Sequence, residues 1–103
     1  MDKRAELIQL IIVEIERIFG EDGFDGDAHQ YEWLLVNCSL TEEDDVQWQQ
    51  ICEWERGEFG EGMDYDDVEL AEREAFLENE ATVIAFLERM LTQYRTATTA
   101  YTS

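Results

Sequence analysis

The sequence predicts an all-α fold: a compact bundle of about four helices, two long and two short, with two acidic, glycine-rich loops. Apolar residues near both ends of the chain recur with the spacing of an amphipathic helix. All 6 glycines fall into two clusters, at residues 20–26 and 57–62, and no two segments form a convincing pair of strands. With 45% hydrophobic and 12% aromatic residues, a chain of 103 residues has enough apolar side chains for one core.

The first predicted helix covers residues 3–19. On a helical wheel, Ile8, Ile11 and Ile15 share one face, while Glu6 and Glu16 lie on the other. This segment is too long for a typical strand, and Gly20 supplies a signal for the end of a helix.

Two short helices are predicted in the middle of the chain. Asp27 begins a segment, residues 29–38, that is either a helix or a buried strand; a helix is favoured because no partner strand is evident. Ser39 or Thr41 then caps a third helix, whose first turn is crowded with acidic residues that suit the helix dipole.

The last predicted helix is the longest and runs from Val68 to about Tyr94. Asp66 and Glu69 form its capping pair, and apolar residues recur every seven positions at Leu70, Leu77, Ile84 and Leu91. Packing against the other helices is the preferred explanation of this stripe, and a seam between two copies in a homodimer is the alternative. Residues 1–95 are thus expected to form a single domain, and residues 96–103 a frayed tail.

Charge is the most informative feature of this sequence. There are 26 acidic residues against 7 Lys and Arg, which gives a formal net charge of -19, and Arg56 is the only basic residue between Glu21 and Glu72. Such a charge repels phosphate backbones and anionic membranes, so neither nucleic acid nor a membrane is expected as a direct ligand. With no secretory signal or membrane span evident, and with Cys38 and Cys52 expected as reduced thiols, the cytoplasm is the expected location.

A dense set of carboxylates fits a basic partner, because it can occupy the Lys and Arg positions that a phosphate backbone would fill. The sequence therefore predicts a non-enzymatic, protein-binding inhibitor that mimics nucleic-acid charge and blocks a basic nucleic-acid-binding protein. Aromatic residues in the loops are the expected anchors of such an interface. The predicted partner-binding residues are Glu21, Asp22, Asp25, Asp27, Glu42, Glu43, Asp44, Asp45, Glu58, Glu61, Asp64, Asp66, Asp67, Phe24, Phe59 and Tyr65.

Two other functions remain open. One is an immunity or antitoxin protein that neutralises a basic toxin and depends more on aromatic anchors than on charge. The other is a degenerate, EF-hand-like calcium module, because residues 21–32 resemble a calcium loop in part. Its candidate ligands are Glu21, Asp25, Asp27 and Glu32, but Gly23 lacks a side-chain oxygen at one ligand position. An acidic loop between helices is the preferred interpretation, with no metal and no cofactor.

Catalytic motifs are not evident. His29 is the only histidine, and no Ser or Cys motif points to it. The glycines lie among carboxylates, which would repel a nucleotide. We therefore expect no enzyme activity.

Overall fold

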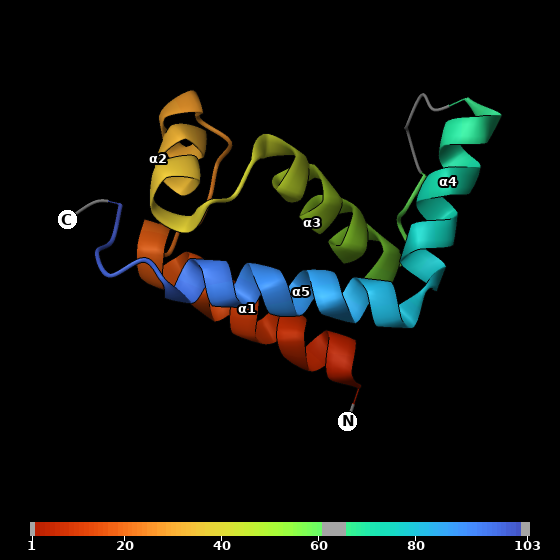
Figure 1. Ribbon diagram of the computed structural model, residues 1–103, viewed down its shortest axis with the longest axis horizontal. Helices are drawn as coiled ribbons and strands as arrows, with labels where there is room; N and C mark the ends of the chain where they lie inside the picture. The colour runs from red at the N-terminus through yellow and green to blue at the C-terminus, as the bar shows by residue number, and fades with distance from the viewer. Residues whose placement is uncertain (1, 61–65, 102–103) are drawn as a thin grey trace.

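A computed structural model describes residues 2–60 and 66–101 of the chain. Within these ranges the fold is all-helical (Figure 1), as the sequence predicts. There are five helices in place of the predicted four: α1 (Lys3–Phe19), α2 (Ala28–Cys38), α3 (Glu42–Glu55), α4 (Asp67–Glu78) and α5 (Glu80–Arg95).

The two long helices, α1 and α5, lie against each other and run in the same direction (Figure 1). Arginines of α1 make a hydrogen bond near each end of this helix: Arg4 Nη1 donates to the Leu77 carbonyl at the end of α4 at 3.4 Å, and Arg17 Nη2 donates to the Tyr94 carbonyl of α5 at 3.1 Å. The apolar stripes predicted on the two helices face each other, and most of the core is built there. Its fully buried members include Ile11, Ile18, Leu87, Met90 and Tyr94.

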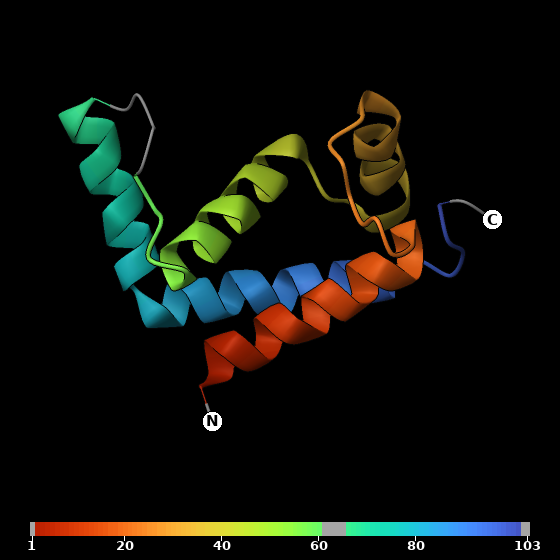
Figure 2. The same ribbon diagram turned by 180° about the vertical axis from the view of Figure 1, so that it is seen from behind.

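The other three helices, α2, α3 and α4, share one orientation. Each begins on the side of the molecule away from α1 and runs toward the layer formed by α1 and α5, as both views show (Figures 1 and 2). Leu34 of α2 and Ile51 of α3 are buried in the same core cluster. This arrangement places three helix N-termini along one edge of the fold.

The predicted helix from Val68 to Tyr94 is wrong in one respect, because it is two helices separated at Asn79. The backbone of Asn79 is extended (φ −83°, ψ 94°), and its N–H donates to the Phe76 carbonyl at the end of α4. Its side chain accepts a hydrogen bond from the Thr82 N–H and so caps the start of α5. One residue therefore ends one helix and begins the next, and α4 turns away from α5 (Figure 1).

The local signals in the rest of the chain are confirmed. Gly20 ends α1 with a positive φ of 88°, in a backbone region that favours glycine. Residues 29–38 are helical, and Thr41, rather than Ser39, caps α3 in a reciprocal capping box with Asp44. The second loop lies partly outside the described residues.

Residues 96–101, the described part of the predicted tail, lie against the helices. Ala97 is buried, and the Tyr101 N–H donates to the Ile18 carbonyl at 2.9 Å. The Tyr101 ring lies 5.5 Å from that of Phe19 and 6.0 Å from that of Trp33. The sequence offered no periodic signal here because a few isolated contacts, rather than a helical face, hold this segment.

None of the described helices is long and apolar enough to cross a lipid bilayer. Cys38 and Cys52 are free cysteines, and burial raises the pKa of both thiols to about 11. Both groups are therefore protonated at neutral pH and are poor nucleophiles.

Candidate functional site

The N-terminal ends of α2, α3 and α4 carry a row of carboxylates, which we call the acidic edge. The described residues of this edge are Asp27, Glu42, Glu43, Asp44, Asp66 and Asp67. The three helix starts are spread along the longest dimension of the molecule (Figure 1), which measures 43 Å. The fold thus gathers on one side acidic groups that are up to forty positions apart in the sequence.

Three carboxylates of the acidic edge cap helices. Asp27 accepts from the His29 N–H at 2.7 Å, and Asp66 accepts from the Glu69 N–H at 2.7 Å. Asp44 completes the capping box by accepting from the Thr41 N–H at 3.0 Å. These groups satisfy backbone donors that helix starts leave free, and they lie at the positive ends of helix dipoles. The helices themselves therefore offset part of the repulsion within the edge.

The other three carboxylates of the edge, Glu42, Glu43 and Asp67, are exposed to solvent. Among residues 2–60 and 66–101, none of the three takes part in an ion pair; on the acidic edge only Asp44 does so, with Arg89 at 2.6 Å. Burial alone would raise the pKa of Asp44, but the hydrogen bonds from Arg89 and Thr41 outweigh it and hold the pKa below its usual value. Most of the negative charge on the edge thus remains available to an external cation.

Asp45 differs from its neighbours, because the structure places it inside the fold and not on the predicted partner surface. It is only 8% exposed and accepts from the Tyr31 hydroxyl at 3.0 Å. The reason is helical spacing: Asp45 shares the inner face of α3 with Trp48 and Cys52, at intervals of three and four positions. Removal from water raises the pKa of the Asp45 carboxyl, although hydrogen bonds from Tyr31 and Gln49 oppose this.

The loop of residues 20–27 connects α1 to α2 and exposes Glu21, Asp22 and Asp25. The carboxylate of Asp25 accepts from the Asp27 N–H at 3.0 Å, so it shapes the start of α2. Among the described residues, no three His, Cys, Asp or Glu side chains come close enough to share a metal ion. The candidate calcium ligands Glu21, Asp25, Asp27 and Glu32 all lie in this part of the chain and are not gathered into such a group.

The loop aromatics predicted as anchors fold back onto the domain where they are described. The half-buried Phe24 ring lies 5.4 Å from Phe19 and 5.0 Å from Tyr31, and the half-buried Phe59 ring lies 5.8 Å from Trp54. Of the remaining predicted residues, Glu58 is exposed and pairs with Arg56 at 2.8 Å. Glu61, Asp64 and Tyr65 lie outside the described residues.

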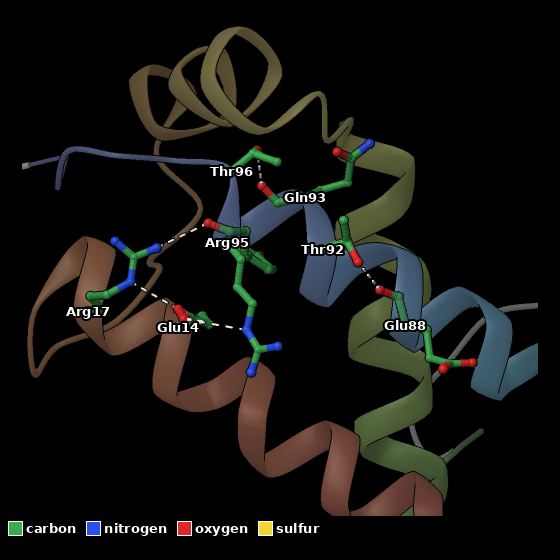
Figure 3. A network of polar contacts seen from close by, with 8 residues as sticks. Glu14, Arg17, Glu88, Thr92, Gln93, Arg95 and Thr96 are labelled. Atoms are coloured by element: carbon green, nitrogen blue, oxygen red, sulfur yellow. Dashed lines mark hydrogen bonds and ion pairs between the residues drawn. The ribbon is translucent and has the colours of Figure 1, made fainter.

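Most basic residues contact carboxylates away from the acidic edge. Arg17 Nε lies 2.9 Å from Glu14, and Arg95 Nε approaches the other oxygen of Glu14 at 4.0 Å (Figure 3). Arg4 pairs with Glu55. Arg73 pairs at 3.1 Å with Glu69, which lies in the first turn of α4 beside the edge. In the described part of the chain, these pairs leave the acidic edge with little cationic compensation.

Sequence reasoning missed an open pocket of about 300 Å³ lined by α1, the turn after it and α3. Its lining combines apolar residues such as Ile12 and Ile15 with the carboxylates of Glu16, Glu21 and Asp22. A helical wheel places Glu16 on the polar face of α1 but cannot show which element lies beside it. The pocket depends on how α3 packs above α1, for which the sequence holds no local signal.

No protein-family model matches this chain, and no curated protein or solved structure was found to match it. A functional assignment must therefore come from the chemistry of its own residues.

Proposed function

We propose that this protein is a non-enzymatic inhibitor that binds a basic, nucleic-acid-binding protein and blocks the surface that this partner uses for nucleic acid. The observation that carries the proposal is the acidic edge, where Glu42, Glu43 and Asp67 face solvent with no ion pair among the described residues. Lys and Arg side chains that bind phosphates also bind carboxylates, through the same charge-assisted hydrogen bonds.

The extent of the molecule is compatible with such a partner. The acidic edge follows the longest dimension of the molecule, which measures 43 Å in total, while one helical turn of B-DNA is roughly 34 Å long (Figure 1). The orientation of α2, α3 and α4 supports the proposed function, because three helix dipoles stabilise acidic groups that would otherwise repel one another.

The immunity-type alternative depends on aromatic anchors, and the structure gives it less support. Phe24 and Phe59 are half-buried against other rings and do not project toward a partner. Charge matching along the acidic edge is therefore the basis of the proposed function. The location that we propose for this protein is the cytoplasm, where nucleic-acid-binding partners are abundant.

The test is a pull-down from nuclease-treated lysate, with the full chain as bait and with elution in steps of increasing salt. We expect capture of one or a few nucleic-acid-binding proteins that moderate salt releases and added DNA displaces. The matched baits are E42Q/E43Q/D67N, which removes three charges from the acidic edge, and E6Q/E80Q/E88Q, which removes three exposed charges from α1 and α5.

Both triple variants lower the net negative charge equally, so only the position of the charge differs. We expect the edge variant to lose most of the captured partner and the control variant to retain it. Capture that resists salt and DNA, or equal loss with both variants, would contradict charge mimicry by the acidic edge.

A further inference from the structure

The pocket between α1 and α3 is walled by α1 on one side and by α3 on the other, and the turn at residues 21–24 closes one end. Figure 2 shows α1 and α3 on the side facing the viewer, with α5 visible between them. Tyr94 of α5 belongs to the lining, so the third helix supplies the base of the pocket. Each of the three helices contributes buried residues to the core.

The base of this pocket is apolar and aromatic. Ile12 and Ile15 come from α1, Trp48 comes from α3, and Tyr94 comes from α5. Ile12 and Ile15 are partly exposed and offer contact to hydrocarbon, whereas Trp48 and Tyr94 are buried beneath the surface of the pocket. Their positions are held by burial, since Trp48 and Tyr94 both belong to the core cluster.

The rest of the lining is mainly anionic. Glu16, Glu21 and Asp22 are exposed around the pocket, and Asp45 lies at its side as a buried carboxylate. Among the described residues that line the pocket, Arg56 is the only cationic one, and its guanidinium donates to Glu58 at 2.8 Å, outside the pocket. A ligand here therefore meets three exposed carboxylates and an apolar surface together.

The volume limits what can enter. About 300 Å³ is at the lower end of the range for ligand pockets, which suits one side chain or a small molecule and not a dinucleotide. A phosphate group would be repelled by the carboxylates. The combination favours a cation on an aliphatic stem, because such a group buries its stem and leaves its charge near the acidic wall.

Arginine fits this combination better than lysine. Its planar guanidinium is weakly hydrated and presents several donors to neighbouring carboxylates, whereas an ammonium is compact and strongly hydrated. We propose that the pocket between α1 and α3 binds an arginine side chain of the basic protein partner. This inference rests on the proposed function for the choice of partner, and it adds a specific anchoring point to the diffuse charge of the acidic edge.

A titration of the full, isotope-labelled chain with N-acetyl-arginine amide, followed by NMR, tests the pocket without any partner protein. We expect saturable shifts at millimolar probe, largest for the amides of lining residues such as Ile15, Gly23 and Gln49. The variant E21Q/D22N should lower the affinity for the probe about three- to tenfold, since each exposed charge pair contributes a modest amount to binding.

The matched control is E43Q/D67N, which removes two charges from the acidic edge and none from the pocket lining. It should change the affinity for the probe by less than about twofold. An equal loss of probe affinity in both variants would overturn the arginine pocket. So would NMR shifts spread over the acidic edge, or an equal affinity for N-acetyl-lysine amide.

The outcome of this titration is separate from that of the pull-down. Probe binding in the pocket with no nucleic-acid-binding protein captured would retain the arginine site and refute the proposed function. Capture that depends on the acidic edge, with no probe binding in the pocket, would retain the function and refute the arginine site.

Discussion

In the layer formed by α1 and α5, Glu14, Arg17 and Arg95 contact one another, whereas on the acidic edge most charged side chains face solvent. Glu14 of α1 forms ion pairs with both Arg17 and Arg95 (Figure 3), and Arg17 also donates to the carbonyl of Tyr94 on α5. On the acidic edge, Glu42, Glu43 and Asp67 have no ion pair among the described residues. One region uses charge to hold helices together, and the other displays it.

The two regions also differ in how deeply some of their apolar residues are buried. The deepest part of the core lies between α1 and α5, where Ile11 and Leu87 are 0% exposed. In contrast, α2 carries Leu35 at 55% exposure and Val36 at 75% exposure. We infer that stability is concentrated in the α1 and α5 layer, and that the other three helices tolerate surface change.

The largest expected effect comes from Leu87→Ala, which deletes a fully buried side chain of α5. Lost burial and the cavity left behind should lower the free energy of unfolding by about 2–5 kcal/mol. The control is Leu35→Ala, the same substitution at an exposed site of α2, which should cost no more than about 0.5 kcal/mol. Urea unfolding followed by tryptophan fluorescence measures both, and similar losses would contradict the division between the two regions.

Local signals in the sequence predicted most of this fold, because they act within one helix. The stripe of Ile8, Ile11 and Ile15 defines α1, and Gly20 marks its end. At Asn79 the same kind of signal was overlooked. The seven-residue spacing of Leu77, Ile84 and Leu91 continues across this residue, so periodicity alone does not reveal that Asn79 caps both helices.

Non-local packing was beyond what the sequence could show. Composition marks residues 42–45 as one acidic run, yet Asp45 is buried and Asp44 pairs with Arg89, 45 positions away. Phe24 lies in an acidic, glycine-rich loop, but its ring packs against Phe19 and Tyr31. The orientation of each residue depends on which distant element covers it, and a single sequence does not give that information.

The adjacent residues Asp44 and Asp45 sharpen the comparison, because one is on the acidic edge and the other is within the core. Asp44→Asn removes the ion pair with Arg89 and a charge at a helix N-terminus, so we expect a loss of about 1 kcal/mol at neutral pH. Asp45→Asn removes a charge from a poorly solvated position while an oxygen remains for the Tyr31 hydroxyl. It should leave stability unchanged or raised, and a loss as large as that of Asp44→Asn would contradict this picture.

The pH dependence of these two variants should have opposite signs. The pKa of Asp44 is lowered in the fold, so its ionised form stabilises the protein above the unfolded pKa of about 3.9, and that contribution disappears as the pH falls through the folded pKa. The pKa of Asp45 is raised, so its ionised form destabilises the fold, and the wild type recovers as the pH falls through that raised value. Urea unfolding of the wild type and both variants from pH 7 to about pH 3 measures these contributions. As the pH falls, the lower stability of Asp44→Asn and any higher stability of Asp45→Asn, each relative to the wild type, should both shrink toward zero.

The smallest expected effect concerns the ion pairs that join α1 to α5. Glu14→Gln should lower the free energy of unfolding by about 0.5–1 kcal/mol, since Glu14 is half-buried and contacts both Arg17 and Arg95. Glu16→Gln, two residues along the same helix, removes an exposed charge close to the negative end of the helix dipole and should be neutral or slightly stabilising. Thermal unfolding in low and high salt resolves such differences, and salt should reduce the effect of Glu14→Gln. A greater loss from Glu16→Gln would mean that the charges of this layer do not bind the helices together, and the contrast with the acidic edge would then rest on burial alone.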